Sequence, residues 1–303
     1  MPCFHPLKAY VAPGKTKKGR RRIVFNRSAG YADLPLSLPC GQCVGCRLER
    51  SRQWAVRCMH EASLHQQNSF ITLTYNNEHL PSDGSLDVTH FQKFMKRLRK
   101  SHAGTIRYYH CGEYGDALGR PHYHACLFGF DFPDRYLWTV TAQGERLYRS
   151  NHLETLWPYG ISSVGDVTFR SAAYVARYIM KKRLGPSAAE YYEKIDPETG
   201  EIIQLKPEYT TMSRRPGLAA GWFDKYKTDV YPDDFVVMNG KKFRPPRFYD
   251  YQLEQRDPEL LDEIKKIRKA SARKHADNNT PDRLAVRETI QQARLDKLKR
   301  SLE

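Results

Sequence analysis

The distribution of apolar and polar residues along the chain predicts alternating strands and helices. Between residues 69 and 75 apolar and polar side chains alternate, which is typical of a strand. After Asp87, a favourable N-cap residue, apolar side chains recur at the helical period as far as residue 100. The same patterns predict further strands over 105–111, 122–130 and 161–169, and further helices over 47–65, 151–157 and 171–182.

The order of these elements is β-α-β-β-α-β-α, which predicts an α+β fold. Four strands with helices on one face form the ferredoxin-like split βαβ arrangement. The amino-acid composition changes on either side of this core. Beyond it, Asn239-Gly240 predicts the turn of a hairpin. We therefore expect a basic, Cys-rich N-terminal segment over 1–66, the core over 67–185, a Pro- and Tyr-rich accessory region over 186–256 and a charged helical tail over 257–303.

Net charge narrows the choice of partner. The chain carries 50 Lys and Arg against 34 Asp and Glu, a formal charge of +16, and residues 1–60 hold 12 basic side chains against 2 acidic ones. Such a basic N-terminal segment favours binding of a polyanion such as nucleic acid. A solvated arm or a localisation tag has the same composition. No run approaches the ~18 apolar residues of a membrane span, and no apolar signal core is found, so we expect a cytoplasmic protein that binds no membrane.

Two histidines separated by one residue are the sharpest chemical feature. His122 and His124 fall on a predicted strand, where side chains two apart share a face and can meet one metal ion. Glu113, at the end of the preceding strand, could complete a three-ligand site suited to Mg²⁺ or Mn²⁺, although Zn²⁺ would also bind. The alternatives are histidines on a solvated or hydrogen-bonded strand face and a Glu113 carboxylate paired with Arg120.

Two tyrosines and a lysine share one face of the last predicted helix of the core. Tyr174, Tyr178 and Lys181 are spaced i, i+4 and i+7. A phenol has a pKa of about 10 and is a poor nucleophile, but beside a metal-polarised phosphate it can form a covalent phosphodiester. Lys181 could then neutralise phosphate charge or help to deprotonate a phenol. The alternative is simple packing of an aromatic helix on the sheet.

The seven cysteines include a C-x-x-C-x-x-C run. Cys40, Cys43 and Cys46 have the spacing of a metal knuckle, and the fourth ligand could be Cys3, which we favour, His5 or Cys58. A structural Zn²⁺ is the preferred reading. The iron–sulfur motif C-x₂-C-x₂-C-x₃-C does not match, because its fourth cysteine position is Arg50. Free thiols without a metal are the remaining alternative.

Basic and aromatic residues could together hold nucleic acid. Trp54 could stack on an unpaired base, but core packing of its helix is the preferred interpretation. The side chains expected to contact DNA are Arg20, Arg21, Arg22, Arg47, Arg50, Arg177, Lys182, Arg214 and Arg215.

Taken in order, three segments resemble the motifs of HUH rolling-circle replication initiators. They are FITLTY, GEYGDALGRPHYHACLFG and YVARYIMKK. The flanking CGQCVGCRLERSRQWAVR and MSRRPGLAAGWF are similar to the initiators of small single-stranded DNA bacteriophages, the gokushovirus branch of the microviruses. The resemblance covers roughly residues 1–250. It implies metal ligation by His122, His124 and Glu113, nucleophilic roles for Tyr174 and Tyr178, and a Y-x-x-K lysine at Lys181.

This resemblance implies an enzyme that nicks origin DNA through a 5′-phosphotyrosyl link and rejoins strands in rolling-circle replication. Its partner would be single-stranded DNA at a replication origin in an infected bacterial cell. Because no Walker-type loop is present, unwinding must come from elsewhere, and a host helicase and polymerase are candidate partners. Two alternatives remain open: a single-tyrosine transposase or relaxase, and a non-catalytic zinc-containing nucleic-acid-binding module.

Overall fold

The computed structural model describes residues 3–16, 21–115, 119–177, 188–195 and 200–297. The chain divides into two compact units, one formed by Met1–Arg50 with Lys266–Arg300 and the other mainly by Ser51–Lys265. Among the described residues, no helix is both long enough and apolar enough to cross a bilayer.

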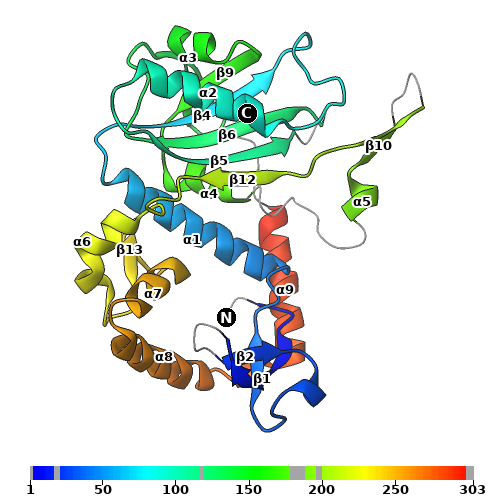
Figure 1. The fold of residues 1–303 in the computed structure, drawn as a ribbon, viewed down its shortest axis with the longest axis vertical. Helices are drawn as coiled ribbons and strands as arrows, with labels where there is room; N and C mark the ends of the chain where they lie inside the picture. Colours follow the sequence, from blue (N-terminus) through cyan, green and yellow to red (C-terminus); the bar gives the residue numbers. More distant parts are fainter. Residues whose placement is uncertain (1–2, 17–20, 116–118, 178–187, 196–199, 298–303) are drawn as a thin grey trace. The chain divides into compact units, whose positions relative to one another are not determined.

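The larger unit is built on a seven-stranded sheet with the order β12-β5-β6-β4-β9-β8-β7 (Figure 1). Each neighbouring pair of strands is antiparallel. The strands are β4 (Asn68–Tyr75), β5 (Arg107–Tyr114), β6 (Pro121–Phe128), β7 (Tyr136–Val140), β8 (Arg146–Arg149), β9 (Gly160–Gly165) and β12 (Tyr209–Met212). Because β4 and β5 are both antiparallel to the β6 strand between them, β4 and β5 run in the same direction.

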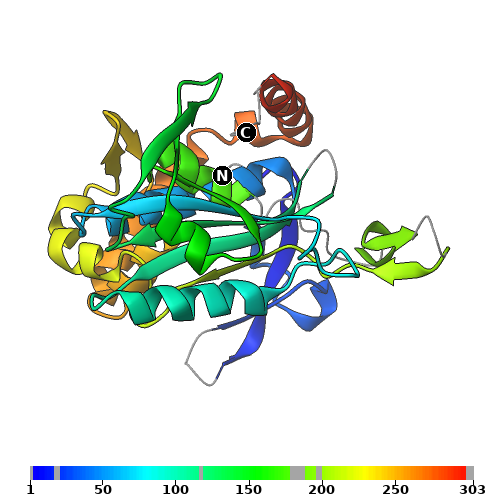
Figure 2. The same ribbon diagram turned by 90° about the horizontal axis from the view of Figure 1, so that it is seen from above.

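Helices cover both faces of this sheet, so the expectation of helices on one face is wrong. The helices α2 (Val88–Ser101) and α3 (Asn151–Leu156) pack on the face that carries Ile71 and Leu73. The helices α1 (Val44–Ala62) and α4 (Phe169–Arg177) pack on the face that carries Phe70 (Figure 2). Alternation along β4 explains the division, because successive side chains of a strand point to opposite faces.

The start and the buried face of α2 confirm the predicted pattern. The carboxylate of Asp87 accepts a hydrogen bond from the backbone N–H of Thr89 at 2.8 Å and so caps the first turn. The apolar stripe that buries against the sheet consists of Phe91, Phe94, Met95 and Leu98.

A third apolar core lies around α6 (Ala220–Val230) and α7 (Arg247–Glu254). The strands β13 (Val236–Met238) and β14 (Lys241–Phe243) form the predicted hairpin, with Asn239 at φ 50° and Gly240 at φ 72°. Positive φ at both positions is what a tight two-residue hairpin turn requires. The charged tail contains two described helices, α8 (Pro258–Arg273) and α9 (Pro281–Asp296), separated by a short 3₁₀ turn at Asp277–Asn279.

The smaller unit contains a three-stranded antiparallel sheet in the order β2-β1-β3. Its strands are β1 (Leu7–Lys15), β2 (Arg21–Val24) and β3 (Pro35–Leu38), with a 3₁₀ turn at Arg27–Ala29. Elsewhere the described chain forms a short helix α5 (Ala188–Tyr191) and a hairpin of β10 (Glu193–Ile195) and β11 (Ile202–Gln204).

Candidate functional site

The register of three neighbouring strands brings the predicted ligands together. On β6, His122 lies opposite Glu113 of β5 on one side and Thr74 of β4 on the other. His124, two residues further along the same strand, lies opposite Thr72. All of these side chains share the sheet face that α1 and α4 cover, because they alternate with residues of the α2 core.

A threonine contacts one ring nitrogen of each histidine. Thr74 Oγ1 lies 2.8 Å from His122 Nδ1, and Thr72 Oγ1 lies 3.0 Å from His124 Nδ1. When Nδ1–H donates to the hydroxyl, Nε2 carries the lone pair, which is how proteins fix the tautomer of a metal-binding histidine. A metal bound at Nε2 would be compatible with both threonine contacts.

The Nε2 atom of His124 faces Glu113, and the Nε2 atom of His122 faces Gly115. His124 Nε2 lies 2.8 Å from Glu113 Oε1, in a pair that is almost fully buried. A side chain at Gly115 would approach His122 Nε2 to 2.7 Å, so glycine keeps space beside that atom. Glu113 does not pair with Arg120, whose guanidinium donates instead to the carbonyl of Tyr75 and to Asn77.

Tyr174 lies directly against this group. Its ring meets the ring of His124 edge-on at a centroid distance of 5.1 Å, and it also packs against Phe70. The side chain is 8% exposed, so it both packs the helix on the sheet and borders the histidines. The Ser51 hydroxyl of α1 donates to the carbonyl of Ala173 at 3.1 Å and helps to hold α4 in place.

A cavity of about 490 Å³ opens beside these residues. Thr72, Thr74, His124 and Tyr174 line it from the sheet and α4, and Trp138 of the β7–β8 hairpin lines another part of its wall. The hairpin also exposes several large apolar side chains, namely Tyr136, Leu137, Trp138 and Val140. This hairpin was not predicted, although the run YLWTV before the Gln143-Gly144 turn is typical of a strand.

Several predicted residues lie outside the described part of the chain. They are Tyr178, Lys181, Lys182 and Arg20.

The described basic residues differ in how accessible they are. Arg21, Arg22 and Arg50 are exposed, as are Arg214 and Arg215 in the turn before α6. Arg47 and Arg177 are half-buried.

The second half of α1 carries an aromatic and a basic side chain that pack within the fold. Trp54 stacks on Tyr109 with 4.8 Å between the ring centroids, so the preferred interpretation as core packing is confirmed. Arg57 donates to the carbonyl of Leu218 and lies between the rings of Trp54 and Phe248. This guanidinium therefore serves the packing of the fold.

The candidate cysteine ligands also lie together. The sulfur atoms of Cys3, Cys40, Cys43 and Cys46 are all within 4.8 Å of one another. The other two candidates for the fourth position are placed elsewhere, since His5 pairs with Glu288 at 2.7 Å and Cys58 is buried in the core beneath α4.

Comparison with known proteins now decides the family. The family described as "Replication-associated protein ORF2/G2P" matches residues 68–183, a span that contains the whole histidine site. Replication-associated protein VP4 of Bdellovibrio phage phiMH2K is 33% identical over 269 residues, which is 86% of this chain and 79% of that protein. The chain belongs to the family of phage replication-associated proteins.

Two further members of this family support the assignment. Replication-associated protein ORF2 of Spiroplasma virus 4 is 34% identical over 90% of this chain and 88% of its own length. Replication-associated protein ORF4 of Chlamydia phage 1 is 34% identical over 70% of this chain and 52% of its own length. No solved structure shows a significant match to the chain.

Proposed function

We propose that this replication-associated protein is a metal-dependent tyrosine DNA endonuclease and strand transferase that initiates rolling-circle replication in an infected bacterial host. The observation that carries the proposal is the histidine pair itself. Both Nδ1 atoms contact threonines, Glu113 lies against one Nε2, and a tyrosine ring borders the same histidine. The relatives are named for replication, which fits this chemistry.

The strand arrangement supports the HUH endonuclease fold. The four strands β5, β6, β4 and β9 are adjacent in that order, and α2 and α3 lie in the connections from β4 to β5 and from β6 to β9. Each connection joins two parallel strands across an intervening antiparallel one, which is the split βαβ arrangement. In this fold the two histidines occupy a central strand, next to the acid on its neighbour.

The donor set fits Mg²⁺ or Mn²⁺. Two imidazoles and one carboxylate leave coordination positions for water and for phosphate oxygen. The centroids of the two imidazole rings are 6.4 Å apart, so ligation by all three residues requires the half-buried His122 ring to turn towards Glu113 and His124. A bound cation would polarise the scissile phosphate and stabilise the charge that develops on it.

The strand transfer uses residues of α4 and the segment after it. The hydroxyl of either Tyr174 or Tyr178 attacks phosphorus, the bond from phosphorus to the 3′-oxygen breaks, and the 5′ end is left on that tyrosine. The phenol loses a proton and the released 3′-oxygen gains one, so no water is consumed. The exchange conserves the phosphodiester bond energy, and rejoining needs no ATP. The other tyrosine would serve the second cut of a replication cycle, with Lys181 neutralising phosphate charge.

The cavity and the basic surface would hold the DNA. Trp138, in the cavity wall that also contains Tyr174, offers a ring for stacking an unpaired base next to the scissile phosphate. Exposed arginines such as Arg214 and Arg215 would contact the backbone. Strand unwinding and synthesis would come from a host helicase and polymerase.

The test is formation of a covalent adduct. Wild-type protein, Mn²⁺ and an origin oligonucleotide labelled on the 3′ side of the nick should give label that stays on the denatured protein. Tyr174→Phe combined with Tyr178→Phe should abolish it, whereas Tyr251→Phe, a change at an exposed tyrosine of α7, should not. DNA binding by the wild type with no adduct under any divalent cation would identify a non-catalytic binding module instead.

The number of nucleophiles has a separate test. With two working tyrosines, each single Phe variant should still cut once but fail to complete repeated replication cycles. Full cycles by one single variant would show a single-tyrosine enzyme.

A further inference from the structure

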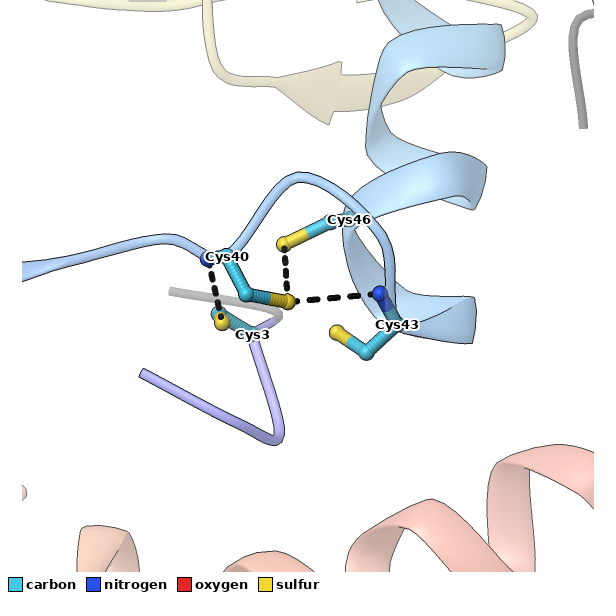
Figure 3. Close-up of side chains that lie close together, drawn as sticks. All are labelled: Cys3, Cys40, Cys43 and Cys46. Carbon is cyan, nitrogen blue, oxygen red and sulfur yellow. Dashed lines mark hydrogen bonds between the residues drawn. The ribbon is translucent and has the colours of Figure 1, made fainter. Parts of the chain in front are cut away.

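Four cysteines from distant parts of the sequence meet in the smaller unit. Cys3 precedes β1, Cys40 and Cys43 lie in the loop between β3 and α1, and Cys46 is in the first turn of α1 (Figure 3). Every pair of these sulfur atoms is within 4.8 Å. Within the described part of the chain, this is the one group of three or more Cys, His, Asp or Glu side chains whose ligand atoms converge so closely.

The spacing of the sulfurs matches one tetrahedral ion. Zn–S bonds of about 2.3 Å place the corners of a tetrahedron ~3.8 Å apart, and Cys40 Sγ lies 4.0 Å from Cys46 Sγ. A disulfide would require about 2.05 Å between two sulfurs, and all four cysteines are free. A cluster of several irons with bridging sulfides would need the cysteines farther apart than a single ion does.

Backbone amides converge on the same sulfurs. The N–H of Cys40 donates to Cys3 Sγ at 3.2 Å, and the N–H of Phe4 donates to Cys43 Sγ at 3.3 Å. Cys40 Sγ itself accepts from the N–H groups of Gln42 and Cys43. Such donors stabilise negative charge on sulfur, which is the charge that a thiolate ligand carries.

One glycine allows this loop to turn. Gly41, directly after the first cysteine of the loop, has φ of +76°, a conformation that disfavours any side chain. The turn brings the N–H groups of the next two residues towards Cys40 Sγ, so the loop is already shaped for a metal knuckle.

The smaller unit, which contains these cysteines, buries few apolar side chains. Its buried apolar residues among those described are Cys3, Phe4, Ala9, Ala12, Cys43 and Leu284. Small units with so few buried side chains generally depend on a metal or on disulfides. A metal bound here would join the segment before β1 to the start of α1, and Leu284 of α9 packs on the same cluster.

We propose that Cys3, Cys40, Cys43 and Cys46 bind one structural Zn²⁺ as a tetrathiolate. Binding replaces four thiol protons by one dication, leaving a centre with a formal charge of −2 and releasing four protons. Soft thiolates select zinc over Mg²⁺ or Mn²⁺, so this centre is chemically distinct from the histidine site. The proposal does not depend on the nuclease function.

Metal content of the full-length protein tests the assignment without DNA. Protein purified without chelators should contain one zinc per chain by elemental analysis. Cys46→Ser should lose that zinc, whereas Cys58→Ala, a change at a buried cysteine in the same helix but outside the cluster, should retain it. Unchanged zinc content in the Cys46 variant, or iron in place of zinc in the wild type, would overturn the proposal.

A second measurement guards against variants that do not fold. Replacing the metal of the wild type by Co²⁺ should give the intense absorption of a tetrahedral ion with four sulfur ligands. Cys3→His should keep one ion per chain but shift the cobalt spectrum towards a three-sulfur, one-nitrogen site. A cobalt spectrum of octahedral type in the wild type, or an unaltered spectrum in the Cys3 variant, would contradict ligation by these four residues.

Discussion

At the scale of single residues, the threonines of β4 contact the histidines of the proposed metal site. A free histidine can carry its proton on either ring nitrogen, and only the unprotonated one can bind a cation. The hydroxyls of Thr72 and Thr74 contact Nδ1 of His124 and His122, and with a metal at Nε2 each Nδ1–H would donate to its threonine. Neither threonine binds the metal in our proposal, yet both would influence its affinity.

Removing one of these hydroxyls should weaken the metal site without removing a ligand. Thr72→Val keeps the shape of the side chain but leaves His124 Nδ1 without its partner. We expect a ~10–100-fold loss in metal affinity or activity, as for other residues that orient metal ligands. The measurement is adduct formation as a function of Mn²⁺ concentration, with exposed Thr228→Val as the control. An unchanged Mn²⁺ midpoint in the Thr72 variant would rule out this positioning role.

The buried His60 should make the stability of the fold sensitive to acid. Burial lowers the pKa of His60 to about 3 from an ordinary 6.5. The centroid of its ring lies 3.5 Å from that of the Trp222 ring, and its Nδ1 lies 2.6 Å from the Tyr249 hydroxyl oxygen.

The sign of the pH effect follows from proton uptake. Below pH 6.5 the unfolded chain protonates His60 and the folded chain does not, so stability is full above pH 6.5 and falls between pH 6.5 and about 3. From pH 6.5 to 5 the loss is about 2 kcal/mol. His60→Phe keeps the stacking but cannot titrate. Urea titration should give this variant a lower free energy of unfolding than the wild type at pH 7 and a smaller decrease between pH 6.5 and 5. An equal decrease in both proteins would show that His60 does not cause the acid sensitivity.

At the scale of elements, the β7–β8 hairpin extends the sheet towards the proposed DNA path. It forms one edge of the sheet, and Trp138 is 54% exposed while also lining the cavity. Large exposed aromatic side chains beside a candidate phosphate site are typical of single-strand binding surfaces.

Trp138→Ala should therefore reduce affinity for single-stranded DNA. Loss of one stacked base corresponds to ~1–3 kcal/mol, or roughly 5- to 150-fold in Kd. Leu137→Ala is the matched control, because Leu137 is equally exposed on the same strand but does not line the cavity. Fluorescence anisotropy with a labelled origin oligonucleotide would measure both. Equal losses in the two variants would assign the effect to the hairpin as a whole rather than to stacking.

The sequence predicted local structure well because its signals are local. Asp87 marks the start of α2, Asn239-Gly240 marks the hairpin turn, and the spacing of His122 and His124 places both on one face of a strand. The face that each helix covers depends on packing between distant segments, so periodicity alone could not show that α1 and α4 lie opposite α2. The same limit applied to β12, which comes from the region after the core yet pairs with β5 and forms one edge of the sheet.

The partners of the site residues were predictable to different extents. Glu113 beside the histidines followed from an antiparallel pairing of consecutive strands. Cys3 was favoured over His5 on its unusual setting, but spacing could not decide between them, because both precede the loop by more than thirty residues. The threonines were missed, although their alternation on β4, the first strand of the core, was visible in the sequence.

At the scale of the whole molecule, positive charge is concentrated in the first 60 residues rather than spread evenly. Much of this stretch belongs to the unit that holds the cysteine cluster, so the proposed zinc centre would order a strongly basic part of the chain. Arg21 and Arg22 are exposed on β2 and have no catalytic role in our proposal. They therefore offer a clean test of where the DNA backbone is bound.

Replacing both arginines should change the salt dependence of DNA binding. For single strands, log K falls with log salt with a slope of about −0.7 for each phosphate contact, because each contact releases condensed counterions. Arg21→Ala with Arg22→Ala should make the slope shallower by ~1.4 and weaken binding similarly for all sequences. Lys266→Ala with Lys269→Ala removes the same charge from exposed positions of α8 and should leave the slope nearly unchanged. If both pairs lower the slope equally, binding responds to net charge alone, and the N-terminal segment is a solvated basic arm rather than a DNA-binding surface.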